Sequence, residues 1–313
     1  MKNATDDLVE FEEISNQIER GYFMAKRIVF GLLWTAIGIS ALVFMHTWFF
    51  LVFAMFLCFM ATYELNRSIG LKNKPIMILS LIASTIFPLY YEYGHLLQQI
   101  NGLNLKAEYL ITTYVLVLCF LMLHNHEKTK FSDVSFVVMS SLFVPFSFTR
   151  LIYFRDIALH HPGKGYTNAH GIFLILFILF SACMTDTFAY FVGSFLGKHK
   201  LCPKISPKKT VEGAIGGVLG CVIANVVLYA VYDNFIFATP IHNYIPIVIA
   251  SVITSIVGMC GDLTASLIKR NYGIKDFGNL IPDHGGIMDR LDSISIVAPF
   301  VYCVLHFSLK VFS

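Results

Sequence analysis

Residues 171–193 read GIFLILFILFSACMTDTFAYFVG and contain a single charged side chain, Asp186. A run of this length predicts a helix that crosses a bilayer, because about 20 apolar residues span the hydrocarbon core and a helix satisfies its own backbone polar groups. The sequence therefore predicts an all-α, polytopic membrane protein with about nine transmembrane helices. The eight other runs lie near 28–45, 47–63, 76–92, 107–123, 134–153, 214–232, 244–264 and 292–312.

The composition agrees with this prediction. Of the 313 residues, 56% are hydrophobic and 14% are charged, whereas a soluble domain has about 25% charged residues. The net charge of +3 gives no indication of a nucleic-acid partner. The seven cysteines stand singly, without the paired spacing of a disulfide framework or a zinc site.

The chain divides into an N-terminal segment and one membrane domain. Residues 1–27 are rich in carboxylates and lack the basic head of a signal peptide. Phe11, Ile14 and Ile18 share one helical face, which predicts either a short interfacial helix or a solvated acidic tail. Residues 28–313 contain no evident internal repeat and form a single predicted transmembrane catalytic domain.

The positive charges predict the orientation. With a cytosolic N-terminus, nine spans place residues 1–27, 64–75, 124–133, 194–213 and 265–291 in the cytosol, and these segments hold eighteen of the 23 Lys and Arg residues. The positive-inside rule favours this arrangement. The chain is short and lacks long soluble extensions, so we expect a bacterial inner membrane.

The first segment that carries chemistry is residues 266–292, SLIKRNYGIKDFGNLIPDHGGIMDRLD. Carboxylates mixed with Lys and Arg indicate divalent-cation chemistry on phosphates. Asp262, which ends the preceding apolar run, and Asp289 form the predicted metal pair; alternatively, Asp262 caps a helix or pairs with Lys269. Asp292 lies three residues after Asp289 and either faces the same site or caps the last helix.

The glycine pair in this segment has two interpretations. Gly285 and Gly286 leave the backbone free to approach phosphate oxygens, or they form a tight turn before the last span. The neighbouring His284, Asp289 and Arg290 favour the functional interpretation, in which His284 positions the substrate.

The second segment is residues 185–217, TDTFAYFVGSFLGKHKLCPKISPKKTVEGAIGG. Its hydroxyls and lysines at a predicted helix start could hold an anionic group. Its small residues predict close helix packing. The residues concerned are Ser206, Lys208, Lys209, Thr210 and Glu212, followed by Gly213, Gly216, Gly217 and Gly220.

These residues resemble the phosphatidate cytidylyltransferases, also called CDP-diacylglycerol synthases. One position departs from the commonest form, because Asp283 stands where a glycine is frequent. The matching positions are Ser266, Lys269, Arg270, Lys275, Asp276, Gly278, Ile281, Pro282, His284, Gly285, Gly286, Asp289, Arg290 and Asp292, and upstream Asp186, Ala189, Tyr190, Gly193, Gly197 and Ser206 to Gly213.

The resemblance implies transfer of a cytidylyl group from CTP to phosphatidate, with Mg²⁺ and an accompanying K⁺, in a homodimer. It implies a polar cavity open to the cytosol and to the lipid, metal-binding roles for Asp262 and Asp289, and an essential Lys269. Two alternatives are a CTP-dependent polyprenol or phytol kinase and an ion-coupled transporter. The predicted catalytic residues are Asp262, Lys269, His284, Asp289 and Arg290; the predicted substrate-binding residues are Asp186, Ser206, Lys208, Lys209, Thr210, Glu212, Arg270, Lys275, Asp276, Gly285, Gly286 and Asp292.

Overall fold

A computed structural model describes residues 31, 33, 35–101, 106–237, 242–280 and 285–311 of the chain. Within these residues, eight helices are long and apolar enough to cross a membrane, which confirms the all-α, polytopic prediction. They are α2 (Trp48–Ser68), α3 (Lys74–Asn101), α4 (Ala107–His124), α5 (Phe131–Arg155), α7 (Asn168–Leu196), α8 (Val211–Phe235), α9 (Ile245–Asn271) and α10 (Met288–Val311).

The ninth predicted span, near 28–45, begins outside the described residues. Its residues 35–43 are helical, and the chain then turns before Thr47. The Thr47 side chain accepts the backbone N–H of Phe49 and thereby caps α2. The predicted interfacial helix within residues 1–27 also lies outside the described residues.

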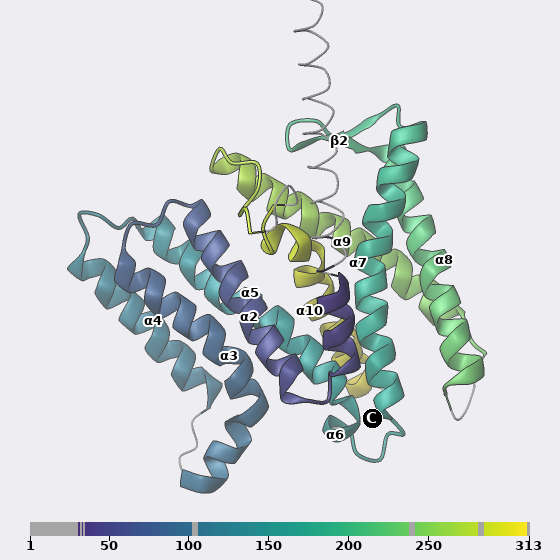
Figure 1. The fold of residues 1–313 in the computed structure, drawn as a ribbon, viewed down its shortest axis with the longest axis horizontal. Coiled ribbons are helices and arrows are strands. Elements are labelled where there is room, and N and C mark those ends of the chain that lie inside the picture. Colours follow the sequence, from purple (N-terminus) through teal and green to yellow (C-terminus); the bar gives the residue numbers. More distant parts are fainter. Residues whose placement is uncertain are drawn as a thin grey trace, which may run out of the picture.

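Helix α10 is central to the bundle and packs against α9, α5, α7 and α2 (Figure 1). Its buried side chains include Leu291, Ile294, Val297 and Val301, which recur every three or four residues as one side of a helix does. The Ser147 hydroxyl of α5 also donates to the Ser295 carbonyl of α10 at 2.6 Å. One side of α10, from Met288 and Leu291 onward, therefore faces the interior of the protein.

Helices α7 and α8 pack closely because glycines line their contact. A Cβ atom at Gly216 would overlap the Val192 side chain, and one at Gly220 would overlap Phe188. Asn225 of α8 donates to the Ser181 hydroxyl of α7 at 2.9 Å. The helix-packing interpretation of these glycines is confirmed.

The polar connections gather at one end of the bundle. Strands β1 (Lys200–Cys202) and β2 (Ser206–Thr210) form an antiparallel hairpin between α7 and α8. Figure 1 places this hairpin at the same end as the α9–α10 connection, and the short helix α6 (Ile157–His160) at the opposite end.

Two helices extend further toward this polar end than the apolar runs predict. Helix α9 continues past residue 264 to Asn271, and α10 begins at Met288. Lys269, Arg270, Asp289 and Asp292 are therefore helical residues, with less freedom than loop side chains.

Candidate active site

An open cavity of about 420 Å³ lies between α7, α8, α9 and the hairpin. Charged side chains from four elements line it: Asp186 of α7, Asp262 of α9, Lys200 of β1, and Lys208 and Lys209 of β2. Lysines and carboxylates facing one volume suit a ligand made of phosphates and a cation.

Asp262 pairs with Lys209 across this cavity. The Ser266 hydroxyl, one turn further along α9, donates to Asp262 Oδ1 at 3.4 Å. The predicted alternative partner of Asp262 was Lys269, and this alternative is wrong, because Lys269 pairs with Asp289 of α10 at 2.8 Å. Both members of the Lys209–Asp262 pair remain partly exposed, so a ligand can reach them.

Asp186, Asp262 and Asp292 lie close enough to interact electrostatically. The Ser293 hydroxyl of α10 links two of the helices by donating to Asp186 Oδ2 at 3.5 Å. Like charges at close range repel unless a cation stands among them. The three aspartates therefore concentrate negative charge where α7, α9 and α10 meet.

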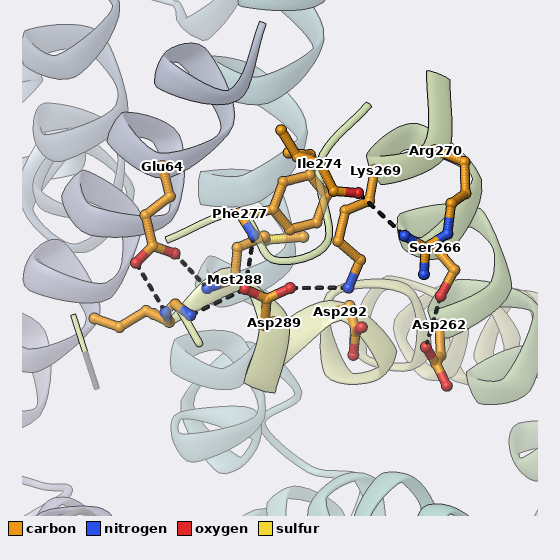
Figure 2. A network of polar contacts seen from close by, with 12 residues as sticks. Glu64, Asp262, Ser266, Lys269, Arg270, Ile274, Phe277, Met288, Asp289 and Asp292 are labelled. Carbon is orange, nitrogen blue, oxygen red and sulfur yellow. Dashed lines mark hydrogen bonds and ion pairs between the residues drawn. The ribbon is translucent and has the colours of Figure 1, made fainter. Parts of the chain in front are cut away.

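Asp289 is held by three donors at the start of α10 (Figure 2). Lys269 Nζ lies 2.8 Å from Oδ1, and the backbone N–H groups of Phe277 and Gly286 donate to Oδ2 at 2.8 and 2.9 Å. The Lys269 ammonium also lies 5.2 Å from the centre of the Phe277 ring. Gly285 has a φ of +84°, which glycine adopts without strain, and it turns the chain toward Asp289.

The two predicted metal ligands thus bind different lysines, Asp262 binding Lys209 and Asp289 binding Lys269. Among the described residues, no group of three or more His, Cys, Asp or Glu side chains is arranged so that it could hold a metal ion. Asp289 already accepts three hydrogen bonds, whereas Asp262 has two other aspartates near it. The metal role of this pair stays a prediction.

Asp292 lies within α10 and does not cap it, because the helix begins four residues earlier. Its side chain is buried, and Oδ1 accepts the backbone N–H of Ser293 at 2.7 Å. Arg290, in the first turn, has an exposed side chain. His284 lies outside the described residues, so its predicted positioning role stays a prediction.

The hairpin residues divide between structural and ligand-facing positions. Ser206 to Thr210 is a strand, and only Thr210 stands at the predicted helix start, where its hydroxyl accepts the Gly213 N–H at 3.1 Å. Glu212 accepts from His199 Nδ1 at 2.6 Å and from the Lys198 N–H at 3.1 Å, which ties the start of the hairpin to α8. Lys208 and Lys209 line the cavity and are the ligand-facing residues among these.

Arg270 joins two segments instead of lining the cavity. Its guanidinium donates to the Ile205 carbonyl of the hairpin at 3.3 Å and to the Ile274 carbonyl at 3.2 Å. Lys275 and Asp276 are exposed on the α9–α10 connection. Their predicted contacts with substrate stay predictions.

One functional candidate was absent from the predictions. Glu64 of α2 is buried, and its carboxylate accepts the N–H groups of Ile287 and Met288 at 3.0 and 2.8 Å. The available signal was a lone carboxylate directly after the apolar run 47–63, a position at which an unpaired charge is costly.

Together, the bundle and its charged cavity define a membrane-embedded protein with a site suited to phosphates. The model of the Cytidylyltransferase family matches residues 25–308, and the chain belongs to this family. The resemblance drawn from the sequence motifs is thereby confirmed.

Several phosphatidate cytidylyltransferases are similar to this chain. The Bacillus subtilis (strain 168) protein is 33% identical over 283 residues, which cover 90% of this chain and 97% of the relative. The Staphylococcus saprophyticus protein is 34% identical over 256 residues, 82% of this chain and 89% of the relative. The Haemophilus influenzae protein is 36% identical over 159 residues, 50% of this chain and 54% of the relative.

Proposed function

We propose that this chain is a phosphatidate cytidylyltransferase, which joins CTP and phosphatidate to give CDP-diacylglycerol and pyrophosphate. Membership of the Cytidylyltransferase family and the similarity to phosphatidate cytidylyltransferases support this function. The structural observation that carries it is the cavity in which Lys200, Lys208 and Lys209 face Asp186 and Asp262 at the polar end of a membrane bundle.

In this reaction the phosphate of phosphatidate attacks the α-phosphorus of CTP in line, and pyrophosphate leaves. The attacking phosphate is already anionic, so no protein nucleophile is needed. The protein must align two anionic substrates and neutralise their charge. We assign Lys208 and Lys209 to the phosphates in the cavity, and Lys269 and Arg290 to phosphate charge beside Asp289.

The carboxylates provide ligands for a divalent cation, for which Mg²⁺ is the proposal. Hard cations prefer oxygen ligands, which the carboxylates of Asp262 and Asp289 would supply, and the resemblance implies the metal role of both residues. When bound, Mg²⁺ supplies charge neutralisation for the triphosphate and the leaving pyrophosphate. The accompanying K⁺ rests on the resemblance alone.

We place the cavity on the cytosolic face of a bacterial inner membrane. The distribution of Lys and Arg supports this orientation, since fourteen of the 23 lie in the α2–α3, α4–α5, α7–α8 and α9–α10 connections or at the helix ends that flank them. CTP then enters from the cytosol, whereas phosphatidate arrives from the surrounding bilayer.

A position-specific label tests the proposal against the kinase alternative. Purified protein in detergent is given phosphatidate, Mg²⁺ and CTP labelled at either the α- or the γ-phosphate. We expect α-label in a CDP-lipid and γ-label in pyrophosphate. Transfer of γ-label to a polyprenol or phytol, with no CDP-lipid formed from phosphatidate, would instead establish the kinase.

A further inference from the structure

Glu64 occupies an unusual position for a buried carboxylate. It belongs to α2, its exposed fraction is 4%, and its two oxygens accept the N–H groups of Ile287 and Met288 at 3.0 and 2.8 Å. These N–H groups are at the start of α10, where a helix has no carbonyls of its own to accept them. A negative charge is also favoured there by the helix dipole.

Two glycines make room for this carboxylate. A Cβ atom at Gly278 or at Gly286 would overlap the Glu64 carboxylate. Both glycines belong to the signature loop, by which we mean residues 272–287, described over 272–280 and 285–287. Two parts of the loop therefore close around one side chain from a distant helix.

The same loop binds Asp289. The backbone N–H groups of Phe277, which precedes Gly278, and of Gly286 itself donate to Asp289 Oδ2, while Oδ1 binds Lys269. Figure 2 shows Glu64 and Asp289 meeting the loop and the start of α10 from neighbouring positions. A shift of the loop away from Glu64 would move the donors that orient Asp289.

Helix α2 is itself fixed in the bundle. Asn66, two residues beyond Glu64, is fully buried and donates to the Ser80 hydroxyl of α3 at 2.8 Å. Its Oδ1 accepts the Ser140 hydroxyl of α5 at 2.7 Å. Glu64 is thus presented to the loop by a helix that two neighbours hold in place.

We propose that Glu64 is a positioning residue: it fixes the signature loop and the start of α10, and through their backbone it sets the geometry of Asp289 and Lys269. The effect of Glu64 on turnover rests on the proposed function. The effect of Glu64 on the order of the loop does not, because it can be measured without an activity assay.

Hydrogen exchange reads the loop directly, without an activity assay. In Glu64→Gln, an NH₂ group replaces one carboxylate oxygen and cannot accept the N–H of Ile287 or Met288. We therefore expect faster hydrogen exchange in peptides covering residues 285–292 and unchanged exchange in α7 and α8. Glu108→Gln, an exposed carboxylate at the start of α4, is the matched control and should exchange like the wild type. Unchanged exchange at residues 285–292 in Glu64→Gln would overturn the proposal.

The two glycines allow a sharper test by double-mutant cycles on thermal stability. We expect Gly286→Ala to be destabilising in the wild type and nearly neutral in the Glu64→Ala background, where the carboxylate is gone. Gly285→Ala serves as the control, because its φ of +84° is strained for alanine whatever stands at position 64. Equal costs of Gly286→Ala in both backgrounds would contradict the proposal.

Steady-state kinetics then test the link to turnover. We expect Glu64→Gln to lower kcat by about tenfold or more and to change the KM for CTP by less than about twofold, since the residue acts through Asp289 and Lys269. Normal kcat together with a disturbed loop would refute the positioning role. A wild type that makes no CDP-lipid, with the exchange and stability results as expected, would refute only the proposed function.

Discussion

At the residue scale, two carboxylates of the site each pair with a lysine from another element of the chain. Lys209 of the hairpin pairs with Asp262, and Lys269 of α9 pairs with Asp289. Partly buried pairs of this kind fix side chains in orientation, because separating them would leave a charge without a partner. Phosphates entering the cavity would meet side chains that are already placed.

The first prediction at this scale concerns Asp289. In Asp289→Asn, the ion pair with Lys269 is lost, and an amide NH₂ meets either the Lys269 ammonium or the N–H groups of Phe277 and Gly286. We expect CTP-dependent pyrophosphate release to fall by at least about 10²-fold, as for other strong electrostatic deletions.

The control for Asp289→Asn is Glu127→Gln, an exposed carboxylate at the same end of the bundle, which should retain full turnover. Helical circular dichroism and gel filtration of both variants should match the wild type. Purified Asp289→Asn with wild-type pyrophosphate release would disprove a catalytic role for this carboxylate.

At the element scale, the glycine-lined contact between α7 and α8 determines where the hairpin stands. The hairpin connects these two helices directly, so the angle and depth of their packing place Lys208 and Lys209 over the cavity. Thr210 adds to this by capping α8 at the point where β2 ends.

We therefore predict that Gly216→Val destabilises the bundle. The added side chain would overlap Val192 of α7, and overpacking of this kind costs about 1–3 kcal/mol. Reversible unfolding in mixed micelles measures the loss of unfolding free energy. Ile215→Val, at an exposed position of the same helix turn, is the control and should have little effect; equal stability of the two variants would contradict the close packing.

At the scale of the whole molecule, the bundle has two chemically different ends. The charged cavity, the hairpin and the signature loop lie at one end, and α6 lies at the other (Figure 1). Such an arrangement suits an enzyme that receives one substrate from water and the other from the bilayer. The homodimer implied by the resemblance stays a prediction, which the mass of the detergent-solubilised protein would test.

The proposed orientation gives the prediction at this scale. In a background without native cysteines, Lys204→Cys in the hairpin turn and Leu159→Cys in α6 present exposed thiols at opposite ends. In intact bacterial cells we expect a membrane-impermeant maleimide to label Leu159→Cys at once, and Lys204→Cys only after permeabilisation. The reverse pattern would place the cavity outside the cytosol.

The sequence by itself determined the helices and the segments that carry chemistry. Apolar runs such as 171–193 suffice for this, because insertion of a helix into a bilayer depends on local length and hydrophobicity. The motifs around Lys209, Asp262 and Asp289 were also evident, since their charges stand out against an apolar chain.

Only the tertiary structure decided which of these side chains meet. Asp262 pairs with Lys209, 53 residues away, instead of with Lys269, which lies about two turns along its own helix. Glu64 accepts the N–H group of Ile287, 223 residues later in the chain, and no sequence pattern around Glu64 predicts that partner. The physical reason is that helical periodicity fixes neighbours along one helix, whereas contacts between helices depend on how all of the helices pack together.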